Sequence, residues 1–339
     1  MKKLFYVLSS AILLVSCNPQ IQNVPKDTVT GLDIGIDASK ELEADQWERT
    51  NLKEYTVFDF VNATDSTVLA ATSRGLFFSK DDGKSWKKTQ NEFLQNKKIT
   101  CLENGKNYIL AGVSEKGIYK SEDKGLTWKL VNSGLEVPGI IIKDITCEKK
   151  IDYAATNKGL FISYTRGESW EEVRNGFPLI KDTQIPVGVN TVLISGKIVF
   201  ALTDVGIVLS KDAGNTWETP VQKDVAIKTM LANFRANPKN KFTGRFFKEG
   251  FYYSPDHGKT WKNSDLEGIN IIKVYISPNG ILYTGASQNG VYRSVDNGNK
   301  WYALNNGLPR ATSVYTFNIT KVGTVLVGTN GKGIFRLIN

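Results

Sequence analysis

The sequence is poor in the side chains that most often perform catalysis or bind metals. Among its 339 residues are one histidine, three cysteines and two methionines. A single histidine, His257, excludes a site built from several histidines, and no cysteine pair has the close spacing of a zinc ligand set. Glycine-rich phosphate loops and the aspartate-rich calcium loop are also absent. We therefore predict no metal, no cofactor and no catalytic residue.

The sequence also lacks a strong charge of one sign. It has 43 basic and 34 acidic residues, which leaves a formal net charge of +9 at pH 7. The excess is spread along the chain, and no compact basic run of the kind that binds nucleic acid is present. We expect no nucleic-acid partner, and only a mild preference for acidic partners.

A long hydrophobic run is missing except at the N-terminus. Residues 1–16, MKKLFYVLSSAILLVS, carry two lysines before an apolar stretch that is too short to span a membrane, as in a secretory signal peptide. The stretch Leu14-Val15-Ser16-Cys17 resembles the bacterial lipoprotein box, which predicts lipidation of Cys17 in the cell envelope. Asn18 is not the aspartate of an inner-membrane retention signal, so the outer membrane is favoured. A plain signal peptide that precedes a cysteine is the alternative.

The two remaining cysteines occur in matching contexts, Ile99-Thr100-Cys101 and Ile145-Thr146-Cys147. An exported protein permits a disulfide between them. Matching strands of neighbouring sheets lie about 10 Å apart, which is too far for a disulfide. Two small core residues on matching strands are therefore the favoured interpretation.

Composition divides the chain into three parts. Residues 18–44 are polar, contain no aromatic residue and show no sustained period. As a flexible coil this segment would average about 30 Å from end to end. We predict a signal peptide over residues 1–16, a lipidated cysteine and tether over residues 17–44, and one folded domain over residues 45–339.

A repeat of 40–47 residues dominates the folded domain. Each repeat has two short apolar segments around a glycine turn, typical of antiparallel strands, followed by an octet of the form Ser-x-Asp-x-Gly-x-x-Trp. The third octet departs from this form, with Thr165 in place of the aspartate. The defining residues of the other octets are Ser79, Asp81, Gly83, Trp86; Ser121, Asp123, Gly125, Trp128; Ser210, Asp212, Gly214, Trp217; Ser254, Asp256, Gly258, Trp261; and Ser294, Asp296, Gly298, Trp301.

The two ends of the domain complete each other. The last repeat, Thr324–Arg336, has its two strands but no octet, whereas Asp45–Thr50 (DQWERT) matches the segment that follows the octets elsewhere. All seven tryptophans fall at this one repeat position. We predict that the segment around Trp47 supplies the outer strand of the last repeat, which closes a ring of seven four-stranded antiparallel blades. An open solenoid would leave Trp47 without its companion strands.

The octets resemble the Asp-box of the BNR-repeat β-propellers. That group includes sialidases, some glycanases and the photosystem II stability/assembly-factor-like propellers. The resemblance covers residues 45–339 and implies an all-β, seven-bladed propeller, but it says little about function. We interpret the octet as structural. Its glycine permits a positive φ, its Ser and Asp accept hydrogen bonds from turn amides, and its Trp is buried.

Strand order predicts where a binding site would lie. The octets, which join third to fourth strands, occupy one face, here called the octet face. The turns between second and third strands and the links between repeats occupy the other, here called the variable face, and loops on a rigid scaffold are where binding usually occurs. In four consecutive repeats the residue before the turn glycine is a cation. We predict that this basic sector binds an anionic partner, and solvated lysines are the alternative. Its members are Arg74, Lys116, Lys158 and Lys332.

The fifth repeat differs from the others in its turn between second and third strands. The segment Arg245–Glu249 is bulkier than the turns of the other repeats. It contains Phe246 and Phe247, which could form an aromatic platform for a sugar or peptide. Burial in the core is the alternative role for these two phenylalanines.

An enzymatic function is disfavoured. The Phe/Tyr-Arg-Ile-Pro motif of sialidases is absent, and those propellers have six blades. A glycanase needs two carboxylates across a cleft, and no spacing singles out a pair among Asp182, Asp204, Asp224, Asp265 and Glu267. We predict a non-catalytic, monomeric scaffold that binds an envelope protein or membrane complex, and the alternative is a carbohydrate-active lipoprotein that binds or hydrolyses a glycan.

Overall fold

The computed structural model describes residues 45–136, 139–195, 198–218 and 268–338, together with residues 235–236, 242–246, 250–254, 262–264 and 266. Every regular element in this part is a β-strand, and every pairing between named strands is antiparallel. The predicted all-β class is confirmed. Within the described ranges there is no helix long and apolar enough to cross a membrane.

The strands form separate sheets that follow one another along the chain. The first four sheets contain β2 (Val57–Asn62), β3 (Val68–Thr72), β4 (Gly75–Ser79), β5 (Lys87–Lys88); β6 (Ile99–Gly105), β7 (Tyr108–Val113), β8 (Gly117–Ser121), β9 (Lys129–Leu130); β10 (Ile142–Glu148), β11 (Ile151–Thr156), β12 (Gly159–Ser163), β13 (Glu171–Glu172); and β14 (Val189–Ser195), β15 (Ile198–Thr203), β16 (Gly206–Ser210). The fifth and sixth contain β17 (Arg235–Ala236), β18 (Phe242–Phe246), β19 (Gly250–Ser254), β20 (Lys262–Asn263); and β21 (Ile271–Ile276), β22 (Leu282–Ala286), β23 (Gly290–Ser294), β24 (Tyr302–Ala303).

The seventh sheet combines the two ends of the domain. It contains β25 (Val314–Ile319), β26 (Val325–Thr329), β27 (Ile334–Ile338) and, on its outer edge, β1 (Gln46–Arg49). Trp47 lies opposite Leu337, and its indole donates a 2.7 Å hydrogen bond to the carbonyl of Leu304 in the link after the sixth sheet. The N-terminal strand thus occupies the position that a strand after an octet occupies in the other sheets.

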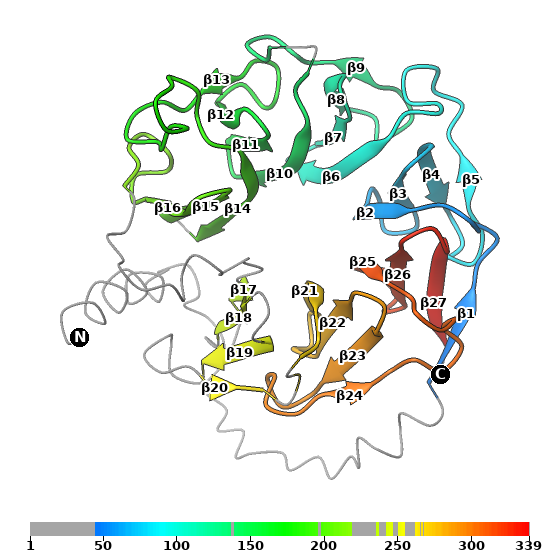
Figure 1. Ribbon diagram of the computed structural model, residues 1–339. Helices are drawn as coiled ribbons and strands as arrows, with labels where there is room; N and C mark the ends of the chain where they lie inside the picture. Colours follow the sequence, from blue (N-terminus) through cyan, green and yellow to red (C-terminus); the bar gives the residue numbers. More distant parts are fainter. Residues whose placement is uncertain are drawn as a thin grey trace, which may run out of the picture.

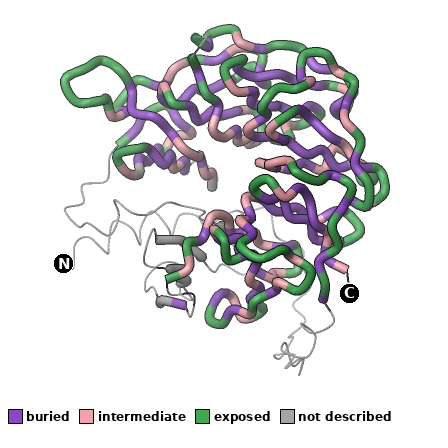
Figure 2. Tube along the Cα trace, turned by 45° about the vertical axis from the view of Figure 1, so that its right-hand side comes forward, coloured by how far each residue is buried: buried purple, intermediate pink, exposed green. Residues whose placement is uncertain are grey.

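The sheets are arranged around a common centre, which their first strands face (Figure 1). The first strands β25, β2, β6, β10 and β14 pack side by side in that order, and β21 packs against β25. Buried apolar side chains fill the spaces between neighbouring sheets. Leu69 and Leu76 of the first sheet share one cluster with Leu102 and Ile109 of the second. Figure 2 shows the buried segments gathered in the strands and the exposed segments in the connections.

The octets hold their turns by a repeated set of hydrogen bonds. In the first octet the Ser79 hydroxyl accepts a bond from the Gly83 amide (2.9 Å), and Asp81 accepts one from the Ser85 amide (2.9 Å). The Trp86 indole donates to the Gly83 carbonyl at 3.1 Å. The same three bonds recur in the second, fourth and sixth octets. Most of the octet's polar groups are therefore satisfied within the octet.

The octet glycine has a second role, because the preceding sheet packs directly against it. Gly83 has a φ of 79°, and a side chain there would begin 2.5 Å from Leu326 of the seventh sheet. Gly125 meets Leu69 of the first sheet in the same way. Only glycine provides both the positive φ and the close approach. Each such octet is thus a joint between two consecutive sheets.

The third octet keeps its turn without the carboxylate. The Thr165 hydroxyl accepts a 2.9 Å bond from the Ser169 amide, as Asp81 does from Ser85 in the first octet. The Trp170 indole donates to the carbonyl of Val131 in the preceding link instead of to its own glycine. The predicted loss of a carboxylate is real, but a hydroxyl takes over its main bond.

The two cysteines do not form a disulfide. Cys101 is buried on β6, Cys147 is half-buried on β10, and both are free thiols. Burial raises the pKa of the Cys101 thiol well above its ordinary value, and the nearby carboxylates of Asp144 and Asp59 raise it further. Their packing is that of small core residues.

Candidate binding surface

The variable face is formed by turns and links that pack on one another. The side chain of Asn132, in the link after β9, accepts a bond from the Ile118 amide (2.8 Å) and donates one to the Lys116 carbonyl (2.7 Å). Asn305 makes the equivalent bonds to Val291 and Asn289 in the sixth sheet. Because each link is fastened to the neighbouring turn, side chains on this face project from a fixed backbone.

The four cations predicted as a basic sector lie on this face, on sheets whose first strands are neighbours. Arg74 and Lys116 are exposed, whereas Lys158 and Lys332 are half-buried. The Lys332 ammonium bonds to the carbonyls of Arg310 (2.6 Å) and Ala311 (3.1 Å). Lys332 therefore fastens a link, and the remaining three cations are the better candidates for contact with a partner.

The same face carries further charges that the sequence reading did not single out. Lys97 and Lys98 are exposed in the link before β6, and Lys143 projects from the start of β10. Asp204 pairs with Lys143, and further acidic residues on these turns and links reduce the positive charge. They are Glu54, Glu92, Glu115 and Glu136.

An aromatic pair lies where the first strands begin. Phe58 on β2 and Tyr315 on β25 stack with ring centroids 6.4 Å apart, and the Lys98 ammonium lies 4.9 Å from the Phe58 centroid. Both strands shift register just after their first residue, and this bulge displaces Phe58 and Tyr315 from regular pairing. In the sequence, the aromatic pair is indicated by two matching stretches, VFDF in β2 and VYTF in β25.

Two half-buried aspartates, Asp59 and Asp144, lie one residue further along the first strands. Asp59 accepts bonds from the amides of Phe60 (2.9 Å) and Leu102 (3.0 Å), so it ties the first sheet to the second. Asp144 accepts bonds from Thr191 and Val192 and ties the third sheet to the fourth. Burial raises the pKa of Asp59 above its ordinary value. Both carboxylates are occupied by bonds between sheets, which is a structural role.

An apolar hairpin follows the third sheet on the variable face. Its strands are joined by bonds from the Ile180 amide to the Ile185 carbonyl (2.8 Å) and from the Val187 amide to the Pro178 carbonyl (3.0 Å). The sequence analysis placed the links between repeats on this face but did not predict this hairpin, which has no counterpart among the other links in the described residues.

The predicted carboxylate candidates do not form a catalytic pair in the described part of the chain. Asp182 lies in the tip of the apolar hairpin, while Asp204 accepts a 3.0 Å bond from Asn190 and lies 3.5 Å from the Lys143 ammonium. The remaining candidates lie outside the described residues or are described only by their backbone. They are Cys17, Asp224, Phe246, Phe247, Ser254, Asp256, His257, Gly258, Trp261, Asp265 and Glu267.

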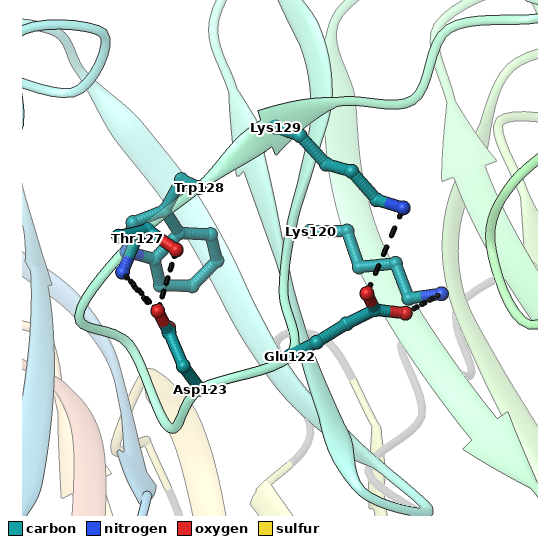
Figure 3. Close-up of a pocket in the computed structure, with 6 residues that line it drawn as sticks. All are labelled: Lys120, Glu122, Asp123, Thr127, Trp128 and Lys129. Atoms are coloured by element: carbon teal, nitrogen blue, oxygen red, sulfur yellow. Dashed lines mark hydrogen bonds and ion pairs between the residues drawn. The ribbon is translucent and has the colours of Figure 1, made fainter.

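A pocket of about 240 Å³ lies on the octet face of the second sheet, lined by Lys120, Asp123 and Trp128 among others (Figure 3). The buried Lys120 ammonium lies 3.0 Å from Glu122 and 2.6 Å from Glu168, and Lys129 lies 2.9 Å from Glu168. The two lysines and the two glutamates neutralise one another, and the Asp123 carboxylate accepts bonds from Ser121 and Thr127 within its octet. Within the described ranges, no cluster of histidine, cysteine and acidic residues could hold a metal ion.

Comparison with known proteins identifies the fold. Residues 37–186 match the model of the DUF6242 beta propeller domain. The chain is a β-propeller. Among solved structures it is similar to Ycf48 bound to a D1 peptide, with a TM-score of 0.66 and 12% sequence identity over 87% of this chain and 95% of Ycf48. No curated protein matches the sequence significantly.

Two larger proteins contain a similar propeller. The extracellular domain of BT4673 from B. thetaiotaomicron aligns with a TM-score of 0.68 and 14% identity over 86% of this chain and 39% of that one. The GH74 xyloglucanase from Xanthomonas campestris aligns with a TM-score of 0.61 and 13% identity over 86% of this chain and 53% of the enzyme. At these identities the likeness establishes the fold alone. The resemblance to assembly-factor-like propellers is confirmed at that level, and the fold by itself does not separate a scaffold from an enzyme.

Proposed function

We propose that this β-propeller is a non-catalytic binding scaffold that holds a protein partner on its variable face. The observation that carries the proposal is the basic sector. Arg74, Lys116 and Lys158 belong to three consecutive sheets and project from a backbone that the neighbouring links hold in place. Opposite charges on a partner would direct its approach and fix its register on the propeller.

The similarity to Ycf48 supports a scaffold of this size. Ycf48 was solved with a D1 peptide bound, and this chain covers nearly the whole of it but only about half of the GH74 enzyme. We further propose that the seven sheets are the seven blades of one closed ring. In this proposal β1 completes the seventh blade and removes the open edge of β27.

We also propose that the scaffold works in a bacterial cell envelope. Residues 1–16 would be removed as a signal peptide, and lipidated Cys17 would anchor the propeller through residues 17–44, most simply at the outer membrane. A non-lipidated Cys17→Ser protein should lose membrane association on fractionation while its propeller keeps its thermal stability. Recovery of that variant in the membrane fraction, unchanged, would argue against the anchor.

A second candidate function is glycan binding or hydrolysis. The observation that favours it is the stacked pair Phe58 and Tyr315, since half-buried aromatic rings at a surface commonly bind sugars through their faces. The GH74 similarity makes xyloglucan-type chains a reasonable first glycan class to test. Without an identified carboxylate pair, binding is better supported than hydrolysis.

The proposal is tested by crosslinked affinity purification from the native envelope. The wild type is compared with Lys116→Glu/Lys158→Glu on the variable face and with Lys84→Glu/Lys150→Glu, which reverses two exposed lysines on the octet face. A stoichiometric protein that is lost only from the first variant supports the scaffold. Equal recovery with all three proteins places the partner elsewhere, and retention on a glycan array without any protein partner favours the second candidate.

A further inference from the structure

We propose that the variable face over the third and fourth sheets is an apolar platform that receives aliphatic side chains of an acidic partner segment. This inference rests on the proposed scaffold function and specifies the chemistry of its partner. The platform consists of Leu179, Ile180 and Ile185 on the apolar hairpin, with Ile141 and Val205 beside them.

The hairpin presents its aliphatic side chains to solvent. Leu179, Ile180 and Ile185 are 40%, 47% and 54% exposed, although all three occupy a segment closed by its own backbone hydrogen bonds. Single exposed aliphatic residues are common on protein surfaces, but several on one short ordered segment form a patch typical of interaction sites. Because the hairpin is already ordered, binding would cost little additional conformational entropy.

Close contacts join the hairpin to the other two platform residues through the turn at Asn157 and Gly159. A side chain at Gly159 would begin 2.9 Å from Pro186 at the base of the hairpin. Ile141 exchanges hydrogen bonds with Asn157, from its amide to the Asn157 side chain (2.6 Å) and from the Asn157 amide to its carbonyl (3.2 Å). The patch therefore extends from the hairpin to the link before the third sheet.

The fourth sheet continues the patch. Gly188 approaches both the Asp204 carboxylate and the Asn157 carbonyl, so the turn that carries Val205 lies next to the turn that carries Lys158. Val205 is 60% exposed. In the four turns of the basic sector a cation occupies the position of Val205, so the face changes from basic to apolar between the third and fourth sheets.

The charge around the platform argues for an acidic partner segment. Lys158 belongs both to the platform's central turn and to the basic sector, whereas Lys143 of the same sheet is paired with Asp204. A segment that places aliphatic side chains on the hairpin and continues over the third sheet toward the first would bring its carboxylates to Lys158, Lys116 and Arg74. Apolar contacts would provide most of the affinity, and the cations would fix the direction.

The entry point of the chain favours a protein over a lipid surface as the occupant. Gln46 pairs with Ile338 at the C-terminal end of β27. The corresponding strands of the other sheets end where their octets begin, so the chain enters the domain on the octet face. An N-terminal lipid tether would then join the domain at its octet face, so the platform lies away from the point of attachment. The platform lies on the opposite face, where a protein segment can reach it.

The test uses synthetic peptides and the full-length protein in detergent. The probe is a short fluorescent peptide with two isoleucines at one end and glutamates at the other, compared with one in which serines replace the isoleucines and one in which lysines replace the glutamates. Ile180→Ser/Ile185→Ser removes the platform. Leu126→Ser/Val322→Ser, which changes two aliphatic residues of the octet face that are 74% and 75% exposed, is the matched control.

We expect the isoleucine–glutamate peptide to bind the wild type and the control, and to bind the hairpin variant about 10-fold more weakly, which corresponds to about 1.4 kcal/mol. The lysine peptide should bind poorly to all proteins. Lys116→Glu/Lys158→Glu should weaken the glutamate peptide and remove much of its salt dependence.

Other outcomes overturn the inference in distinguishable ways. Equal binding of the serine peptide, or equal binding to the hairpin variant, shows that the platform is not used, and the basic sector and the scaffold function would stand. If no peptide binds but anionic vesicles are bound and lost with the hairpin variant, the platform is a lipid contact. Concentration-dependent dimers lost with the same variant would make a second copy the occupant. If affinity purification also fails, the proposed function fails with the inference.

Discussion

Two lysines near opposite ends of β8 show how the two faces of this propeller differ. Lys120, near the end of β8 on the octet face, is 3% exposed, lies between Glu122 and Glu168, and has its ammonium 4.8 Å from the ring centroid of Tyr108. Lys116, just before the same strand on the variable face, is exposed to solvent. One lysine serves the fold, and the other is available to a partner.

The same contrast holds for the two faces as a whole. On the octet face, serine, aspartate, glycine and tryptophan satisfy one another within each octet and join consecutive sheets. On the variable face the backbone is equally well fastened, but charged and aliphatic side chains project outward. The residues that recur in every repeat build the fold. The residues that differ between repeats are those that can give a propeller its own partner.

The largest effect should come from Trp128→Ala. Trp128 is buried in the cluster between the first and second sheets, and its indole donates to the Gly125 carbonyl at 3.1 Å. Removing a buried aromatic side chain costs about 3–5 kcal/mol of unfolding free energy. Phe93→Ala, at an exposed aromatic residue of the variable face, should cost less than about 1 kcal/mol. Denaturant unfolding measures both, and similar losses would contradict the contrast between the faces.

Substitutions of the two lysines near the ends of β8, Lys120 and Lys116, should give the next largest difference in stability. Lys120→Met should lower the free energy of unfolding by about 1–2 kcal/mol, because it removes charged hydrogen bonds to Glu122 and Glu168 while keeping the apolar stem. Lys116→Met should change it by less than about 0.5 kcal/mol. The two proteins are compared by denaturant unfolding at low and high salt. A larger loss for Lys116→Met would reverse the assignment of roles.

A smaller, pH-dependent effect is expected for Asp212→Thr. Bonds from the Thr216 amide and hydroxyl hold the pKa of Asp212 below its ordinary value. A lowered folded-state pKa stabilises the protein above the unfolded pKa of about 3.9, and this stabilisation is lost as the pH falls through the folded value. The variant should lose about 1 kcal/mol at neutral pH, and the difference from the wild type should shrink below about pH 4. A difference independent of pH would show that the carboxylate charge is not responsible.

The smallest effect is expected for Thr165→Asp, which gives the third octet the residue found at that position in the others. The Ser169 amide already donates to the Thr165 hydroxyl, so the variant should gain no more than about 0.5 kcal/mol at neutral pH. The gain should disappear below about pH 4, opposite in sign to the change in Asp212→Thr. Thermal unfolding across this pH range checks it, and a loss of stability at neutral pH would show that the third octet is adapted to threonine.

The repeated features of the fold could be predicted from the sequence. The alternation of apolar and polar residues predicts the two strands around each glycine turn, and the spacing of glycine and tryptophan predicts the octets. Both patterns depend only on residues that are close in sequence. The match between DQWERT and the segments after the octets indicated where β1 belongs. The prediction of seven blades in a closed ring stays a prediction, although seven sheets are present and β1 pairs with β27.

The variable face was much less predictable. The cations before the turn glycines were found because they share a repeat position, yet the bonds of Lys332 to the link at Arg310 were not foreseen. The apolar hairpin and the packing of Pro186 against Gly159 occur once, so no period reveals them. The Lys120–Glu122 ion pair lies within the second repeat, whereas Lys120–Glu168 joins two repeats, so a single repeat shows only one of its partners.

The pairing of β1 with β27 also has a consequence for how the domain is made. Trp47 is among the first folded residues to be synthesised, but its strand partner, Leu337, is among the last. Trp47 therefore becomes buried only after β27 has been synthesised. Contacts between residues so distant in sequence slow folding. A chain cut short before β27 would leave Trp47 and the outer edge of β26 exposed, which invites aggregation and proteolysis. The pairing of β1 with β27 thus distinguishes a domain that includes both strands from a truncated one, because each strand covers an edge or side chain that the other leaves exposed.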